Sequence, residues 1–465
     1  MSDPADDRPD DDQSPDEASS PWSGRPEDGI AELLRQAGIP VEEGASLEDM
    51  LSQLAHQMVS QLKRRADLAG SGSQPVTWKA AKEAAHQQVT QLGSDPAPTS
   101  EQQRQVTDAA HLVDLWLDEH TAFPRLATVP VAWSRTDWID QTMPRWQSMI
   151  EPVISTIAAG LHSAMSQRLA EADQVPELAE LSDVLQPILR QAADGMFGAR
   201  LGRELGRIAA DIVTATDSGF PLTDQAQVAI LMTNLLAWAR DLELPETDVL
   251  LYHASRESAR QRLFHDVAWI GPQLIALVQH YAREIRIDPD ALSIAIEQAV
   301  PREVTAEAVS QFEIDINTAM FDPAKTTEQV AILERLETLI ALVEGWVDHV
   351  TGQATQDWMP SAVALAETVW RRRAARGPAA DVFATLLGLT IRPKRLREAE
   401  AFWGRLLALT DVDGRDEVWN HPDRMPSAED LTDPDGFLER RRSGVSDDPL
   451  DAELRRLLAD EPPAT

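Results

Sequence analysis

The chain has 465 residues, of which 43% are hydrophobic and none is cysteine, and its formal net charge at pH 7 is -35. So acidic a surface argues against nucleic acid or an anionic membrane as a partner, because both attract basic proteins. Without cysteine, disulfides and Cys-ligated zinc are excluded. The N-terminus lacks the basic start and apolar run of a signal peptide, and no apolar window is long enough to span a bilayer. We therefore expect a cytoplasmic protein.

The polarity of the two chain ends predicts the domain limits. Residues 1–28 are rich in Asp, Pro and Ser and should form a disordered acidic tail, because they cannot bury a core. Residues 441–465 are expected to form a flexible C-terminal tail. Between the tails we predict an N-terminal helical region over 29–135 and a second helical domain over 136–440.

Helical periodicity dominates the region between the tails. An apolar stripe recurs through residues 47–65, "LEDMLSQLAHQMVSQLKRR", and a long helix is predicted across 223–242. Ser100 with Gln103, and Ser134 with Asp137, have the spacing of helix capping boxes. The best strand candidate is the short segment "LATVPVAW" over 126–133. The sequence therefore predicts a mainly α, multi-helix body with few or no short strands.

Two glycine-containing segments invite a ligand-binding interpretation that their details exclude. Gly198, Gly202 and Gly206 recur every four residues, but no Gly-Lys-Ser/Thr follows, so close helix packing explains them better than a phosphate loop. In "DVDGRDEVWNHPD" the glycine stands at position four of a possible calcium loop instead of six. A turn and a helix cap account for this segment.

One predicted helix, over 247–264 with Thr247 as its cap, carries a degenerate metal-binding motif. Its segment Arg256-Glu257-Ser258-Ala259-Arg260 has the frame of H-E-x-x-H with arginine at both histidine positions. In a zinc protease the two histidines bind the metal and the glutamate polarises a bound water. Arginine cannot replace either ligand, because it stays protonated and offers no lone pair.

A second helix, predicted over 326–350 from a Thr326 or Thr327 cap, carries an acidic residue within an apolar stretch. Glu344 shares a helical row with Asp348 and is followed by Gly345, which is expected to remove side-chain bulk beside the carboxylate. A buried, unpaired carboxylate is costly, so Glu344 should need a cation, and Arg256 or Arg260 would serve.

Together these stretches resemble an actinobacterial family of zincin-like hydrolases commonly labelled zinc-dependent metalloproteases. The resemblance covers roughly residues 75–440 and rests on "PVTWKAAKEAA", "LGSDP", "LVDLWLDE", "AWSRTDWI", "GMFGARLGRELGRIAADIV", "DSGFPL", "SRESARQRLFHDVAWI", "YAREIRID", "LVEGWVDHVTG" and "VDGRDEVWNHPDRMPSAEDL". It implies a zincin-like domain over 136–440 and zinc as the family's metal. It places Glu257 at the general-base position and Glu344 at that of a third ligand, with the two histidine positions falling on Arg256 and Arg260.

Three functions remain open from the sequence. In the first, the protein is a pseudoenzyme or scaffold without zinc, in which Arg256 or Arg260 pairs with Glu344 or Asp348 and the partner is another protein or a peptide. In the second, it is an active metal-dependent peptidase or hydrolase that uses His253 and Glu257 with Glu344, Asp348 or His349. In the third, the same arginines bind an acidic ligand.

Overall fold

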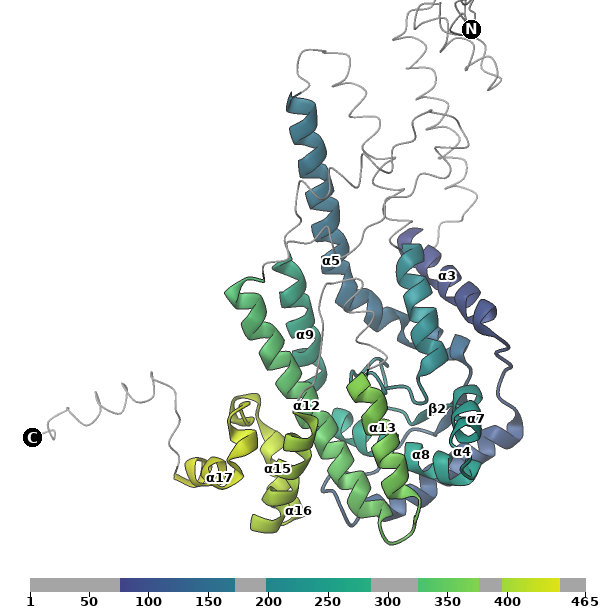
Figure 1. Ribbon diagram of the computed structural model, residues 1–465, viewed down its shortest axis with the longest axis vertical. Coiled ribbons are helices and arrows are strands. Elements are labelled where there is room, and N and C mark those ends of the chain that lie inside the picture. Colours follow the sequence, from purple (N-terminus) through teal and green to yellow (C-terminus); the bar gives the residue numbers. More distant parts are fainter. Residues whose placement is uncertain (1–75, 172–197, 286–324, 376–394, 444–465) are drawn as a thin grey trace, which may run out of the picture. The chain divides into compact units, whose positions relative to one another are not determined.

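The computed structural model describes residues 76–171, 198–285, 325–375 and 395–443, all of which belong to one compact unit (Figure 1). The predicted tail over 1–28 and the apolar stripe over 47–65 lie outside the described residues, as does the predicted C-terminal tail from residue 444 onward. The division of the helical chain at residues 135 and 136 stays a prediction.

The described part of the chain is mainly helical, which confirms the predicted fold class. Its principal helices are α3 (Val76–Leu92), α4 (Ser100–Leu117), α5 (Arg135–Glu171), α7 (Met232–Asp241), α8 (Glu246–Asp266), α9 (Ile270–Arg283), α12 (Thr327–Thr355), α13 (Ala362–Ala375), α15 (Leu396–Leu409), α16 (Val412–Asp416) and α17 (Pro434–Ser443). Residues 198–211 are also helical. Within the described ranges, no helix is long and apolar enough to cross a membrane.

Two three-residue strands, β1 (Val131–Trp133) and β2 (Ala229–Leu231), pair in parallel. β1 lies at the end of the predicted strand segment, but the helix predicted over 223–242 is wrong in its first half, because α7 begins only at Met232. Ala229 O accepts from Ala215 N (3.1 Å), and Leu231 N donates to Val213 O (2.8 Å). These long-range hydrogen bonds override the local helical pattern.

The two predicted capping boxes have different outcomes. Ser134 and Asp137 form theirs, since Asp137 N donates to Ser134 Oγ (3.0 Å) and Ser134 N to Asp137 Oδ2 (2.8 Å). The box predicted at Ser100 is wrong by one residue, because Thr99 and Gln102 make it. Gln103 is committed elsewhere: its Nε2 donates to Pro130 O (2.8 Å) and its Oε1 accepts from Ala132 N (3.0 Å), which fastens α4 to β1.

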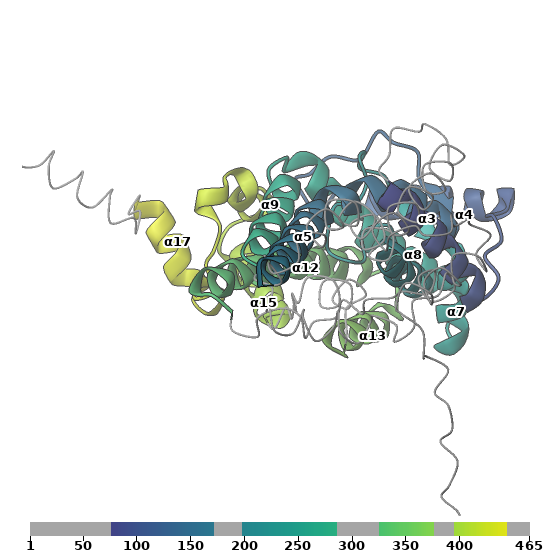
Figure 2. The same cartoon turned by 90° about the horizontal axis from the view of Figure 1, so that it is seen from above.

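The long helix α12 is the element around which the others pack. It contacts α8, α4 and α9, and it also contacts α15, which leads to α16 and α17 (Figure 1). Figure 2 shows α15 and α17 on the side of α12 away from α8 and α4. Trp346 of α12 and Trp403 of α15 are fully buried, and Trp269 packs against the same core. These tryptophans anchor the core between the helices.

Glycines allow several helices to approach closely. A Cβ on Gly202 would clash with the backbone oxygen of Ala81 in α3, and one on Gly206 would lie 2.6 Å from Gln88 Cβ. The predicted packing role of these glycines is therefore confirmed. Gly345 serves a different purpose from the one predicted. Its missing Cβ makes room for α15, since a Cβ there would lie 2.6 Å from Ala399 Cβ.

The segment that fails as a calcium loop forms a capped turn. Asp411 Oδ1 accepts from Gly414 N (2.8 Å) at the start of α16, as predicted. The buried Asp416 at the end of α16 then accepts hydrogen bonds from Trp346 Nε1 (2.8 Å) and Thr121 Oγ1 (2.9 Å). This short helix thereby ties the C-terminal segment to α12 and to the chain that follows α4.

We predict that Gly202→Ala destabilises the protein by about 1–3 kcal/mol, because the added methyl group overpacks the contact with α3. The matched control is Gly352→Ala on α12, where a Cβ would meet nothing within 4 Å. This control should leave the protein as stable or up to about 1 kcal/mol more stable, since alanine favours a helix. Urea unfolding of both variants makes the comparison. Equal stabilities would contradict the inferred packing.

Candidate functional site

Helix α8 carries the segment Arg256–Arg260, which the sequence predicts to be a degenerate motif, through the interior of the protein. It begins at Glu246 after Pro245, and no side chain caps it, so the predicted Thr247 cap is wrong. Every residue from Tyr252 to Leu263 is buried, including the four charged residues of this stretch. The charged motif is therefore not a solvated helix face. Its charges have to be compensated by other side chains.

The motif arginines pair with the two carboxylates of α12. Arg260 binds Glu344 through two hydrogen bonds, from Nε to Oε1 (2.8 Å) and from Nη2 to Oε2 (3.0 Å). Arg256 donates from Nη2 to Glu344 Oε2 (3.2 Å) and from Nη1 to Asp348. The side chains of Arg256, Arg260 and Glu344 are at most 4% exposed. The ion pairs that the sequence led us to expect are thus present between α8 and α12.

A third arginine, Arg373 of α13, completes the shell around Glu344. Its Nη1 donates to Glu344 Oε2, and its side chain is 11% exposed. Burial alone would raise the pKa of Glu344, but the charges of Arg260, Arg373 and Arg256 outweigh it and hold the pKa at about 2. Sequence reasoning missed Arg373, because nothing distinguishes it from the two arginines before it.

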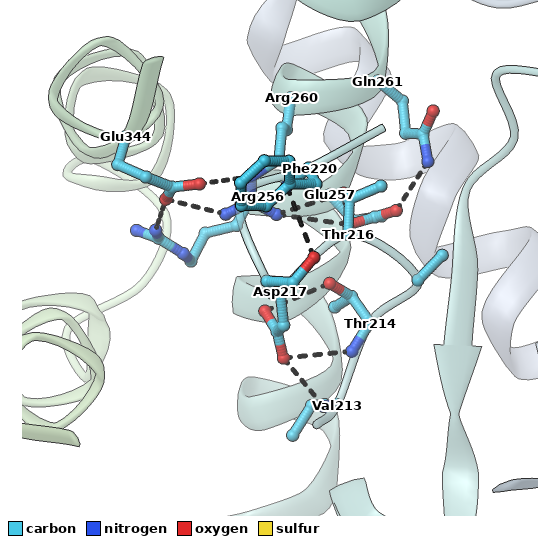
Figure 3. Close-up of polar contacts among 12 residues, drawn as sticks. Val213, Thr214, Thr216, Asp217, Phe220, Arg256, Glu257, Arg260, Gln261 and Glu344 are labelled. Carbon is cyan, nitrogen blue, oxygen red and sulfur yellow. Dashed lines mark hydrogen bonds and ion pairs between the residues drawn. The ribbon is translucent and has the colours of Figure 1, made fainter. Parts of the chain in front are cut away.

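Glu257, which the resemblance places at the general-base position, has hydrogen-bond partners on both carboxylate oxygens. Its Oε2 accepts from Thr216 Oγ1 (2.7 Å) and Arg260 Nη1 (3.2 Å), and its Oε1 accepts from Gln261 Nε2 (2.8 Å). Burial raises the pKa of Glu257 in spite of Arg260 and these hydrogen bonds. Both oxygens are therefore directed at protein donors (Figure 3).

The loop over 213–220 borders the site, since Thr216 Oγ1 donates to Glu257 Oε2 (2.7 Å) (Figure 3). Asp217 organises it by accepting from the backbone nitrogens of Val213 (2.7 Å) and Thr214 (3.1 Å). Gly219 has a φ of +80°, and a Cβ there would lie 3.6 Å from Glu344 Oε1. The sequence segment "DSGFPL" begins in this loop, but no site role was predicted for it. The only indication in the sequence was that its polar residues lie between apolar neighbours.

His253 lies one turn before Glu257 on α8 and is buried. Its ring packs edge-on against Trp238 at 4.6 Å between centroids, and it is 3% exposed. Among the described residues, neither ring nitrogen has a hydrogen-bond partner. Burial lowers the pKa of His253 to about 3, although Asp217 nearby acts in the opposite direction. The imidazole is therefore neutral at pH 7.

Comparisons with known proteins identify the family of the chain. The model of the zincin-like metallopeptidase family matches residues 76–438. The chain belongs to that family. A crystal structure from Chloroflexus aurantiacus, described as a candidate hydrolase with a novel fold, is similar with a TM-score of 0.53 and 16% identity, covering 78% of this chain and 98% of that one. This likeness concerns the fold alone. No curated protein matches the chain. The actinobacterial affiliation stays a prediction.

The side chains at this site do not fit the zinc ion that the family implies. Among the described residues, no three or more His, Asp or Glu side chains are grouped so that they could hold a metal ion. Glu257, Glu344 and Asp348 each contact a guanidinium group instead. Arginines in direct contact with all three carboxylates would also repel a dication.

We predict that Glu344→Gln lowers the free energy of unfolding by about 3–5 kcal/mol, because it leaves three buried guanidinium groups without their shared counter-charge. The matched control is Glu334→Gln, an exposed residue on the same helix, which should change stability by less than about 0.5 kcal/mol. Urea unfolding at pH 7 measures both. A loss in Glu344→Gln no larger than in the control would show that the ion pairs do not hold α8 against α12.

We predict that His253 makes the protein less stable as the pH falls below 6.5. The pKa of His253 is about 3 in the folded chain and has an ordinary value of 6.5. Between these values only the unfolded chain gains the proton, so stability should fall by up to about 1.4 kcal/mol per pH unit. His253→Phe should remove this contribution between pH 6.5 and 4.5, whereas the exposed His265→Gln should not. Unfolding free energies across this range provide the test, and identical slopes in wild type and His253→Phe would refute the assignment.

Proposed function

We propose that this chain is a catalytically impaired member of the zincin-like metallopeptidase family, a pseudoenzyme that acts as a scaffold. The observation that carries this proposal is the contact of Glu344, the residue at the third-ligand position, with three guanidinium groups. This carboxylate accepts four hydrogen bonds from Arg256, Arg260 and Arg373, so a metal ion would have to displace guanidinium groups to bind it.

The arginines account for how the fold keeps this site without a metal. A guanidinium group matches a carboxylate with two parallel hydrogen bonds, as Arg260 does with Glu344. It can therefore supply the positive charge that holds α8 and α12 together. It cannot supply Lewis-acid chemistry, because it has no open coordination position with which to polarise water.

The surroundings of Glu257 support the same proposal. A general base needs an oxygen within hydrogen-bond reach of the water it activates. The Oε2 of Glu257 already faces Thr216 and Arg260, and its Oε1 faces Gln261. Its role here is to anchor the loop over 213–220 and to compensate Arg260.

A scaffold acts through binding, so we infer a protein or peptide partner. The net charge of -35 disfavours nucleic acid and anionic membranes as partners, and a cytoplasmic location is proposed on the sequence features described above. The carboxylates already bound to Arg256 and Arg260 argue against an acidic ligand at these arginines.

One observation favours a second candidate, metal-dependent hydrolysis by His253, Glu257 and Glu344. Both ring nitrogens of His253 are free of hydrogen bonds to the described residues, as a metal ligand without its metal would be. For this function Glu344 would have to exchange its guanidinium partners for a cation.

Metal content and activity distinguish the two candidates. For a pseudoenzyme we expect wild-type protein purified without chelator to carry zinc far below one ion per chain, as measured by mass spectrometry. It should also cleave a panel of fluorogenic peptides no faster than Glu257→Gln. Stoichiometric zinc that disappears in both His253→Ala and Glu344→Ala, together with cleavage that Glu257→Gln abolishes, would establish the second candidate. The far-UV circular dichroism of each variant controls for unfolding.

A restored motif provides a converse test. The double variant Arg256→His, Arg260→His removes two guanidinium groups and recreates the two imidazole ligands. We expect it to bind zinc in competition with a chromophoric chelator under conditions in which the wild type does not. Glu344→Ala added to this double variant should weaken zinc binding by at least about tenfold, because it removes a ligand. Equal zinc binding by the wild type and the double variant would contradict the proposal.

A further inference from the structure

The outer surface of α4 and the end of α12 expose large apolar side chains at one place. Leu112 is 40% exposed, Leu115 is 56% exposed, and Trp358, which follows α12, is 66% exposed. Leu112, Leu115 and Trp116 are spaced by three and four residues, so they share one side of α4. Trp116 stacks on Trp358, with ring centroids 6.2 Å apart and planes within 3°.

This surface is held rigidly from beneath. Trp116 is partly buried and packs against both core clusters of the described residues. Trp358 N donates to Thr355 O (3.1 Å), and the adjacent Met359 is buried with its own nitrogen bonded to Thr355 O (2.9 Å). The turn after α12 therefore fixes Trp358 outward against Trp116. An exposed tryptophan in a fixed position loses little conformational entropy on binding, which is typical of interface anchors.

Exposed carboxylates lie close to the apolar side chains along the chain. Asp108 lies one turn before Leu112 on α4, Glu119 lies one turn after Leu115, and Asp357 precedes Trp358. These three side chains have no hydrogen bond or ion pair to another described residue. The other carboxylates of this region are compensated, since Asp114 pairs with Arg262 and Asp118 with Arg125.

We propose that a basic amphipathic helix of another protein docks on one surface, which we call the α4 face. The α4 face consists of seven residues: Leu112, Leu115, Trp116 and Trp358, together with Asp108, Glu119 and Asp357. The apolar side of such a helix would cover the leucines and the Trp116–Trp358 stack, with its leucines at three- and four-residue spacing. Its lysines or arginines would meet the three carboxylates, which would speed association and fix the orientation.

The charges of the α4 face select this partner over two others. A second copy of the chain is disfavoured, because a symmetric contact would bring the same three carboxylates of each copy together. An anionic membrane surface is disfavoured, because the carboxylates would be repelled by the lipid headgroups. The proposal does not depend on whether the Glu344 site hydrolyses peptides.

The test uses the full chain and a fluorescein-labelled peptide of leucine and lysine, with leucines at helical spacing. The comparison peptides are the same sequence with glutamate in place of lysine, and a shuffled leucine–lysine sequence without an amphipathic period. Fluorescence anisotropy at low and high salt gives the dissociation constants. We expect the amphipathic leucine–lysine peptide to bind at least tenfold more tightly than either comparison peptide.

Two apolar variants locate the binding surface. Trp358→Ala and Leu115→Ser should each weaken binding of the leucine–lysine peptide about tenfold, equivalent to about 1.4 kcal/mol. The control is Val330→Ser, which alters an apolar side chain that is 51% exposed on the first turn of α12. It lies about 40 Å from Trp358, at 1.5 Å per helical residue, and should leave the affinity unchanged. All three positions are exposed, so thermal melting by circular dichroism should show an intact fold.

A charge-matched pair of triple variants tests the role of the carboxylates. Asp108→Asn, Glu119→Gln, Asp357→Asn should weaken binding severalfold at low salt and remove most of its salt dependence. The control is Glu334→Gln, Glu429→Gln, Glu439→Gln, which removes the same charge from exposed positions elsewhere and should have little effect. Equal weakening by both triple variants would show that only the net charge of the protein attracts the peptide, and it would overturn the proposal.

Two further results would also overturn it. One is peptide binding that is unaffected by Trp358→Ala and by Leu115→Ser. The other is self-association of the peptide-free protein, seen by sedimentation velocity and abolished by Trp358→Ala, because that would assign the α4 face to a second copy of the chain.

Discussion

The contact of one buried carboxylate with three arginines is the constraint on which the centre of this protein depends. Glu344 lies inside α12, and its compensating charges come from Arg256 and Arg260 of α8 and from Arg373 of α13. None of these four groups could be buried alone without a large desolvation cost. Their burial therefore requires that α8 assemble with α12 and α13, which follow it at a distance in the sequence.

The same network differs in its source of positive charge from the site of a zinc peptidase. In a zinc peptidase a metal ion supplies the positive charge between the two site helices, and its open position serves catalysis. Here guanidinium groups supply the charge and use the carboxylate lone pairs in doing so. Glu257, the predicted general base, is hydrogen-bonded to Thr216, Arg260 and Gln261. The arrangement preserves the packing of the site while its polar groups satisfy one another.

Charged side chains in the interior of the protein differ from those on its surface. The described residues engage their buried charges almost wholly in pairs. The exposed α4 face instead combines apolar side chains with carboxylates that form no ion pair with another described residue. A chain with a net charge of -35 keeps most of its acidic residues in water, where they cost little and repel other acidic molecules. The proposed binding role places the function on the surface.

The sequence by itself determined the helical class, the two site helices and the candidate pairing of Arg256 and Arg260 with Glu344, because helical period and charge compensation are local or simple requirements. Only the tertiary structure decided that Arg373 and the loop over 213–220 join the site and that Ala229–Leu231 form a strand. It likewise decided that Gly345 accommodates α15, and that Gln103 forms hydrogen bonds with β1 and its preceding residue instead of a helix cap. Each of these features depends on partners distant in the chain, and residue spacing carries no information about which distant groups will meet.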